Sequence, residues 1–148
     1  MVNILSFDIG GANTKATFLK TENAKTKEQK TVLEYFPVWK NGKSQLSEVL
    51  KKLRKQLANS MVLDGVGVTI TAELSDAYQT KKEGINHVLD CVSQVFCDVP
   101  LFVLDVEANL VSVEEARKNH LRVASANWAA TGWITKQAIK DCIVVDVG

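Results

Sequence analysis

A carboxylate, two glycines and a lysine lie close together near the start of the chain, in residues 7–15 (FDIGGANTK). Glycine permits backbone conformations and close approaches that side chains prevent, so successive N–H groups here could point at one anion. Asp8 ends an apolar run and is placed to hold a magnesium ion, directly or through water. We therefore predict a catalytic, metal-binding Asp8 and a phosphate-binding loop formed by Gly10, Gly11, Ala12, Asn13, Thr14 and Lys15.

This loop differs from the two best-known phosphate-binding motifs. A P-loop needs Gly-x-x-x-x-Gly-Lys-Ser/Thr before a helix, and a dinucleotide-binding turn needs Gly-x-Gly-x-x-Gly opening a helix. Here the glycines separate two segments that both have strand character. A plain hairpin turn would explain the glycines, but not Asp8 together with Asn13, Thr14 and Lys15, so we favour phosphate binding.

The end of the chain repeats the pattern of its start. Residues 143–148 (IVVDVG) give an apolar strand, an aspartate, an aliphatic residue and a glycine, as residues 6–10 do. We expect Asp146 to be a second catalytic and metal-binding carboxylate, and Gly148 to bind phosphate. The repeat predicts two related lobes: residues 1–141 form the first, and residues 142–148 form the first strand of a second lobe that is missing.

Five further residues, besides Asp76, are candidates for acid–base chemistry or substrate binding. Glu73 and Asp76 follow a buried strand and could act as a general base, or could simply cap the next helix. Asp105 and Glu107 follow another buried strand and should reach the edge where sites of α/β sheets gather, or could be ordinary loop acids. Asn127 and Trp128 could form a substrate wall in which the indole stacks on an aromatic ring, although Trp128 could equally be a core residue.

Hydrophobic periodicity indicates which elements position these residues. Three strands (2–7, 14–19 and 31–36), with an exposed loop at 21–30, are followed by alternating helices and strands. A three-strand meander followed by such alternation predicts an α/β fold with a mixed sheet covered by helices. The later elements are helix 46–57, strand 65–70, helix 85–96, strand 101–104, helix 108–118, a loop with a helix or turn at 127–140, and strand 142–145.

Composition limits the partners. The net charge of +1 in 148 residues, without a basic stripe, argues against nucleic acid. No apolar run approaches the roughly 20 residues of a membrane helix, and the first residues do not read as a signal peptide. Cys91, Cys97 and Cys142 lie among apolar residues without metal or redox spacing, so we expect buried, reduced thiols and a cytoplasmic location. The sequence leaves the oligomeric state unknown.

The chain resembles the superfamily of actin, sugar kinases and heat-shock ATPases, in which two ribonuclease-H-like lobes each supply a phosphate loop. Residues 8–15 resemble the first loop, and residues 146–148 resemble the opening of the second. With residues 69–76 (TITAELSD) and 126–132 (ANWAATG), the resemblance narrows to the hydantoinase/oxoprolinase branch and its archaeal methanofuran-biosynthesis synthases. Hydantoinases typically have an acid soon after the glycines, where this chain has Asn13, Thr14 and Lys15.

The resemblance implies a transferase that joins an aminomethyl-furanmethanol diphosphate to the phenol of γ-glutamyltyramine and releases diphosphate. Its partner would be a small-molecule phosphoester, with Mg²⁺ as cofactor and ATP possible but not required. Two other classes stay open. One is an ATP-dependent hydantoinase/oxoprolinase-like hydrolase or small-molecule kinase, and the other is a non-enzymatic actin-like nucleotide switch.

Overall fold

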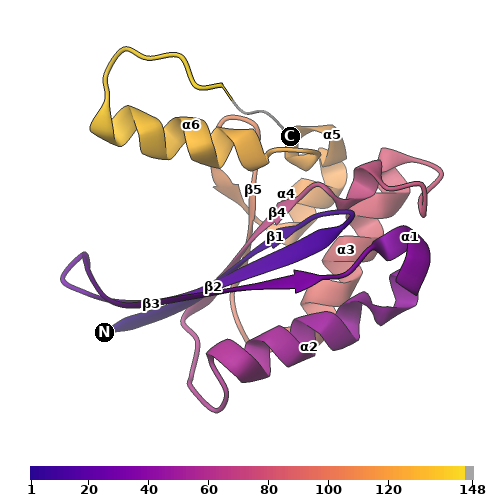
Figure 1. Ribbon diagram of the computed structural model, residues 1–148, viewed down its shortest axis with the longest axis horizontal. Helices are drawn as coiled ribbons and strands as arrows, with labels where there is room; N and C mark the ends of the chain where they lie inside the picture. Colours follow the sequence, from indigo (N-terminus) through magenta and orange to yellow (C-terminus); the bar gives the residue numbers. More distant parts are fainter. Residues whose placement is uncertain (146–148) are drawn as a thin grey trace.

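One mixed β-sheet organises the chain, in the strand order β3-β2-β1-β4-β5-β6 (Figure 1). The computed structural model describes residues 1–145. The first three strands form an antiparallel meander, β4 and β5 run parallel to β1, and β6 turns back antiparallel to β5. This order is that of a ribonuclease-H-like lobe, so the predicted fold class is confirmed. The strands are β1 (Val2–Ile9), β2 (Asn13–Glu22), β3 (Lys25–Tyr35), β4 (Gly65–Ile70), β5 (Leu101–Leu104) and β6 (Leu110–Val111).

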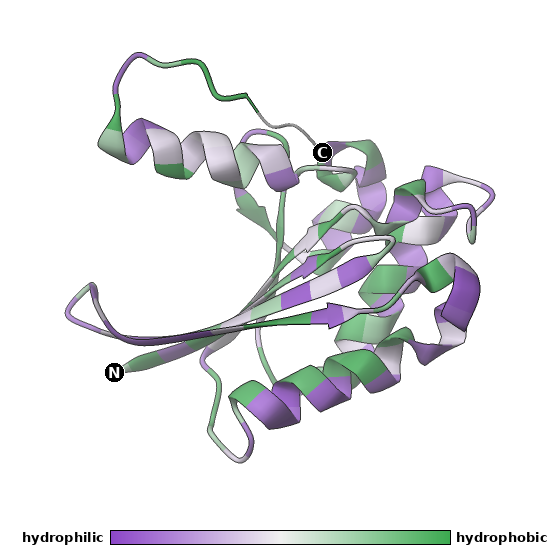
Figure 2. Cartoon of the chain, in the orientation of Figure 1, coloured by the Kyte–Doolittle hydropathy of each residue, from purple (hydrophilic) through white to green (hydrophobic). Residues whose placement is uncertain are grey.

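Two long helices cover one face of the sheet and enclose the core. Leu5, Phe7 and Ile9 of β1 are buried on this face, whereas Ser6 and Asp8 alternate onto the other. The apolar stripe of α2 (Leu46–Leu57) is buried as its leucine spacing predicts, and Figure 2 shows this green stripe turned toward the sheet. The helix α3 (Lys81–Val95) packs beside α2, and the Thr80 hydroxyl accepts the Glu83 N–H at its start.

The remaining helical segments lie at the edges of the sheet or on its other side. In Figure 1, α6 lies on the side of the sheet opposite to α2. Among the described residues, no helix is both long enough and apolar enough to cross a bilayer. The remaining helical segments are α1 (Val38–Asn41), the 3₁₀ helices η1 (Lys43–Gln45) and η2 (Ala72–Leu74), α4 (Val113–Lys118), α5 (His120–Val123) and α6 (Asn127–Ala138).

The predicted exposed loop at residues 21–30 is wrong. These residues belong to β2 and β3, which are joined by a two-residue turn at Asn23 and Ala24. Both turn residues have positive φ, 50° and 59°, as a hairpin turn that matches strand twist requires. The segment projects beyond the core and is exposed on nearly all sides, so its sequence shows no apolar alternation.

Two later predictions also need correction. The predicted helix 108–118 begins only at Val113, because residues 110 and 111 pair with β5 and the Ser112 hydroxyl then accepts the Glu115 N–H. Residues 142–145 form no strand, and Ile143 is 92% exposed with no ladder partner. A strand needs a neighbouring strand for its backbone groups. The proposed division at residue 141 stays a prediction, and Asp146 and Gly148 lie outside the described residues.

The cysteines are all free, but only Cys91 is buried. Cys97 and Cys142 are exposed, contrary to expectation. Cys97 follows the last residue of the apolar stripe of α3 and lies past the helix end, so its apolar neighbours in sequence do not cover it.

Candidate active site

Asp8 lies near the end of β1 on the face of the sheet that α2 and α3 leave open. Its register partners are Lys15 on β2 and Thr69 on β4. The Lys15 Nζ lies 3.2 Å from Asp8 Oδ2, and the Thr69 hydroxyl donates to Oδ1 at 3.3 Å. The Asp8 side chain is 32% exposed, so the carboxylate is oriented by its neighbours while remaining open to a ligand.

The glycine turn between β1 and β2 is held from both sides. The Gly10 N–H donates to the Asn13 carbonyl, and the carbonyls of Gly11 and Ala12 accept the N–H groups of Val38 and Phe36, all at 2.9 Å. By contrast, the N–H groups of Gly11 and Ala12 donate to no acceptor within residues 1–145. Two adjacent N–H groups in a fixed turn are therefore available to an anion.

The glycines let neighbouring atoms pack close to the backbone of the turn, and they do not provide unusual backbone angles. Neither Gly10 nor Gly11 has a positive φ, which corrects the expectation that the turn depends on such angles. A Cβ on Gly10 would lie 2.8 Å from the Asn13 carbonyl oxygen, a contact that real Cβ atoms do not make. The requirement at position 10 is thus steric.

The other residues of the predicted phosphate loop divide between the two faces of the sheet. Asn13 and Lys15 alternate onto the open face with Asp8. Thr14 is completely buried on the helix-covered face, and its hydroxyl has no hydrogen-bond partner among the residues that the structure describes. Only the main chain of Thr14 is thus left as a candidate for phosphate contact.

Two hydroxyl residues that the sequence analysis did not single out border the glycine turn. The Thr71 N–H donates to the Ile9 carbonyl at 2.9 Å, which fixes η2 beside the turn. A Cβ built on Gly10 would be 3.4 Å from the Thr71 hydroxyl, and one on Gly11 would be 3.4 Å from Ser75 Cβ. The signal for both was the predicted end of β4, which lies parallel to β1 and therefore ends at the same edge.

Glu73, the candidate base, lies inside the wall of the site. Glu73 is only 3% exposed, and its Oε1 accepts a hydrogen bond from the Ser125 hydroxyl at 2.6 Å. Oε2 is buried without a partner in the described chain. A Cβ on Gly84 would lie 2.6 Å from Glu73 Cα, so α3 packs directly against η2. Asp76 is exposed and does not cap α3, because Thr80 does.

Asp105 and Glu107 reach the edge of the sheet as predicted, but in a separate cluster. Asp105 is 2% exposed, and its Oδ1 accepts the N–H groups of Glu107 and Asn109 at 2.9 Å each. Arg122 donates to Asp105 Oδ2 at 2.9 Å and also pairs with Glu107 at 2.9 Å. Burial alone would raise the pKa of Asp105, but the hydrogen bonds from Arg122 and the two N–H groups outweigh it and hold the pKa below its usual value.

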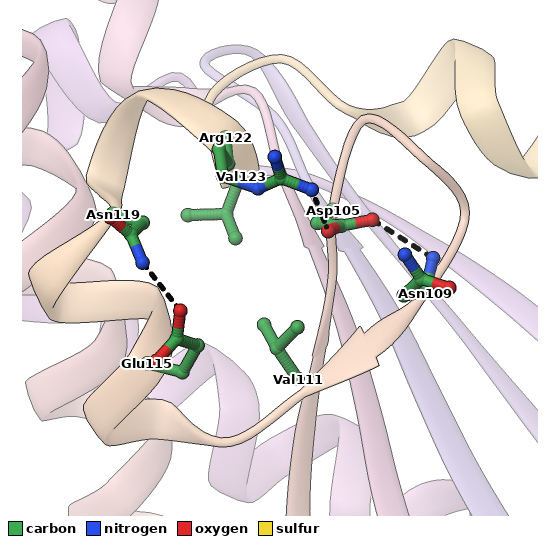
Figure 3. A pocket seen from close by; sticks show the side chains of 7 residues that line it. All are labelled: Asp105, Asn109, Val111, Glu115, Asn119, Arg122 and Val123. Atoms are coloured by element: carbon green, nitrogen blue, oxygen red, sulfur yellow. Dashed lines mark hydrogen bonds and ion pairs between the residues drawn. The ribbon is translucent and has the colours of Figure 1, made fainter.

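Figure 3 shows Asp105, with Arg122 and Asn109 bonded to it, at one side of a pocket of about 430 Å³. The strand β4 separates β5 from β1, so Asp105 starts about 10 Å away from the strand that carries Asp8. The structure thus does not bring Asp105 and Glu107 into contact with Asp8. The pocket is lined by Asp105, Asn109, Val111, Glu115, Asn119, Arg122 and Val123.

Asn127 and Trp128 begin α6, close to the end of β4. The Ser125 N–H donates to the Ile70 carbonyl at 2.9 Å, which ties the start of α6 to the strand that leads into η2. Asn127 Oδ1 accepts the Trp128 N–H at 3.0 Å. The Trp128 indole is 58% exposed, so it is a surface residue and not part of the core.

The donor set suits magnesium better than a metal held entirely by protein. Within residues 1–145 there is no group of three His, Cys, Asp or Glu side chains that could hold a metal ion. Magnesium typically binds through one or two carboxylates and completes its octahedron with water and phosphate oxygens. The partly exposed Asp8 carboxylate and the N–H groups of Gly11 and Ala12, which have no acceptor within residues 1–145, fit that mode. Asp146 lies outside the described residues.

Comparison with known proteins gives one close relative. The chain is 42% identical over 148 residues to the (4-{4-[2-(gamma-L-glutamylamino)ethyl]phenoxymethyl}furan-2-yl)methanamine synthase of Methanocaldococcus jannaschii. The match covers 99% of this chain and 41% of the synthase, so the chain spans about two fifths of the length of this relative.

Solved structures and a family model add two further findings. Two structures of the Aquifex aeolicus Ppx/GppA enzyme are similar at TM-scores of 0.40 and 0.41, with 12% and 17% identity. They match 68% and 72% of this chain and 35% and 37% of theirs. The model of the family described as hydantoinase/oxoprolinase matches residues 64–148, which is more than half of the chain. The chain therefore belongs to the hydantoinase/oxoprolinase family.

Proposed function

We propose that the complete protein is an ether-forming transferase of methanofuran biosynthesis that releases diphosphate. Its substrates would be an aminomethyl-furanmethanol diphosphate and the phenol of γ-glutamyltyramine. The observation that carries the proposal is the 42% identity over nearly the whole chain to a synthase whose named product holds a phenoxymethyl-furan ether. The open carboxylate and free N–H groups at the glycine turn support it, because a diphosphate needs both a cation and hydrogen-bond donors.

The reaction is a substitution at the carbon attached to the furan ring. The bond from this carbon to the diphosphate oxygen breaks, and its electron pair leaves with diphosphate. The electron-rich furan stabilises the positive charge that develops on the carbon. The phenol oxygen forms the new bond, and its proton passes to a base.

The residues around the glycine turn are proposed to receive the leaving group. The N–H groups of Gly11 and Ala12 would donate to diphosphate oxygens, and Lys15 would add a positive charge from the open face. Magnesium held by Asp8, with Asp146 as the proposed second carboxylate, would supply charge neutralisation for the departing diphosphate. Donors fixed before the reaction are most effective where charge develops in the transition state.

Glu73 is the proposed base, acting through Ser125. The Glu73 carboxylate is buried, whereas Ser125 is only partly buried and donates its hydroxyl proton to Glu73 Oε1 at 2.6 Å. The phenol proton would pass to Ser125 Oγ while the Ser125 proton passes to Glu73. The transfer leaves Glu73 neutral in the wall of the site and leaves the phenol oxygen with the electron pair that forms the ether bond.

The test is a reaction of the complete protein with both substrates and magnesium, with and without ATP. Diphosphate release and the coupled ether are followed, the ether by mass spectrometry. Ether formation without ATP, abolished in Asp8→Asn, is the expected result. If no ether forms and ATP is hydrolysed with another substrate, the protein is a hydrolase or kinase. If nucleotide changes its shape while no metabolite is consumed, it is a switch.

A further inference from the structure

A groove between α6 and the β5–β6 loop takes no part in the reaction steps proposed above. It has a volume of about 260 Å³ and runs along one side of α6. Two tryptophans line it, Trp128 and Trp133, with side chains 58% and 56% exposed. The lining residues are Val106, Glu107, Ala108, Trp128, Ala129, Gly132, Trp133 and Lys136.

The helix geometry makes the two indoles opposite walls of this groove. At 3.6 residues per turn, Trp128 and Trp133 point about 140° apart around the helix axis. Gly132, Lys136 and Ala129 fall between them, so the floor at Gly132 has no side chain. The groove thus has aromatic sides and a floor open to a flat group.

Gly132 is not explained by packing within the described chain. A Cβ at this position would meet nothing within 4 Å. Glycine inside a helix costs stability relative to alanine, so it is unfavourable unless something must come close to the backbone there. Its position between two exposed tryptophans points to a ligand that lies against the helix.

The groove is lined by one acidic and one basic side chain, as the binding of a zwitterionic group requires. Within residues 1–145, Lys136 is in no ion pair, so its ammonium is available to a carboxylate. Glu107 shares its charge with Arg122 but keeps a side chain 62% exposed, so it can still accept from an ammonium group. Lys136 lies about 12 Å along the helix from Trp128, a length that an extended tyramine with its glutamyl group can cover.

We propose that this groove binds the phenol substrate, with the aromatic ring beside Trp128 and the glutamyl end at Lys136 and Glu107. The inference rests on the proposed function, because γ-glutamyltyramine is the substrate that combines an aryl ring with a free α-carboxylate and α-ammonium. Ser125, just before α6, is bonded to Ile70 at the end of β4 and to Glu73 of η2, so the Trp128 end of the groove is the end of α6 that is tied to these elements. The glutamyl end extends away from the reacting atoms.

The experiment measures binding of γ-glutamyltyramine to the complete protein by calorimetry, and the KM for this substrate in ether formation. Trp133→Leu should raise the dissociation constant and KM about tenfold, because an aromatic wall is lost. Trp39→Leu is the matched control, since Trp39 on α1 is also 56% exposed but does not line the groove. Lys136→Met should raise KM about threefold, as loss of one exposed ion pair does.

Gly132→Ala separates binding from folding. Alanine fits the open space and favours the helix, so the melting temperature should rise or stay unchanged. Its methyl group would nevertheless fill the floor, and KM for the phenol should rise about fivefold or more while KM for the diphosphate is unchanged.

The outcomes distinguish this inference from the proposed function. Ether formation with unchanged phenol KM in both Trp133→Leu and Gly132→Ala overturns the groove and leaves the function intact. If the unaltered protein binds γ-glutamyltyramine but forms no ether, and Trp133→Leu weakens that binding, the function is overturned and the groove remains an aryl-binding site. A lower melting temperature or a changed oligomeric mass in both variants, with unchanged KM, shows that protein covers this face and overturns the groove.

Discussion

Asp8 and Asp105 both end parallel strands at the same edge of one sheet, yet their surroundings differ. Asp8 is one-third exposed and receives one hydroxyl hydrogen bond and one lysine contact. Asp105 is buried and accepts two backbone N–H groups and an arginine. A carboxylate whose oxygens are fully engaged holds its loop together, and one with spare lone pairs can take a cation or substrate. A position at the sheet edge makes an acidic residue a candidate for the site. The number of hydrogen bonds that its carboxylate already accepts then shows whether it can bind a ligand or only stabilises its loop.

The sharpest test of this comparison replaces Asp8. We expect Asp8→Asn to lower kcat/KM at least about 1,000-fold, since the carboxylate proposed to hold magnesium against the leaving diphosphate is lost. The melting temperature should change little, because the ion pair with Lys15 is exposed. Steady-state kinetics and thermal unfolding of the same preparation measure both quantities. A large loss of stability with full activity would reverse the roles assigned to the two aspartates.

The matching change at Asp105 should affect folding instead. Asp105→Asn keeps an Oδ1 for the two backbone N–H groups but replaces the Oδ2 that accepts from Arg122 with an amide nitrogen, at a cost of about 2 kcal/mol in the free energy of unfolding. This figure is at the low end for such pairs because Arg122 is half exposed. The kcat per folded molecule should stay within about twofold, because Asp8 lies two strands away. Urea unfolding and kinetics at low temperature separate the two effects.

The same aspartate predicts a pH dependence. The pKa of Asp105 is lower in the folded chain than its ordinary value, so its ionised form stabilises the fold. That contribution is complete above the ordinary aspartate pKa and is lost as the pH falls through the lower folded value. We expect the acid side of the stability profile to flatten in Asp105→Asn. An unchanged profile by circular dichroism would mean that Asp105 does not titrate differently in the two states.

The two glycines of the turn offer a smaller contrast. Gly10→Ala places a Cβ 2.8 Å from the Asn13 carbonyl and should cost about 1–3 kcal/mol of stability while displacing the turn. Gly11→Ala meets Ser75 Cβ at 3.4 Å, a tight contact that a small shift can relieve, and keeps its N–H. Its effect should be confined to a weaker affinity for diphosphate. Equal losses of stability in the two variants would contradict the steric explanation of Gly10.

Sequence reasoning located the fold and the glycine turn between the first two strands because both depend on local signals. The leucine spacing of α2 and the apolar runs of β1, β4 and β5 are read directly from periodicity. The β2–β3 hairpin was missed because strands exposed on both faces carry no apolar alternation. Thr71 and Ser75 were missed because their closeness to Gly10 and Gly11 arises from the parallel pairing of β1 and β4, across some 60 residues. The burial of Thr14 and Glu73 likewise depends on which face the helices cover.

Lys15 provides the finest test of how open the Asp8 carboxylate is. Its ammonium is the cation nearest to Asp8 Oδ2 in this structure, so a divalent ion that binds the same oxygen must compete with it. Lys15→Met should therefore tighten Mn²⁺ binding severalfold in the absence of diphosphate, measured by electron paramagnetic resonance, while weakening diphosphate binding about tenfold. Asp8→Asn is the control and should bind no Mn²⁺ at this position. Because the ion pair is exposed, its loss should change stability by less than about 1 kcal/mol, so both changes in affinity can be measured on folded protein. Tighter metal binding together with weaker diphosphate binding would show that Lys15 serves the leaving group, whereas weaker binding of both would show that Lys15 orients Asp8 for the metal.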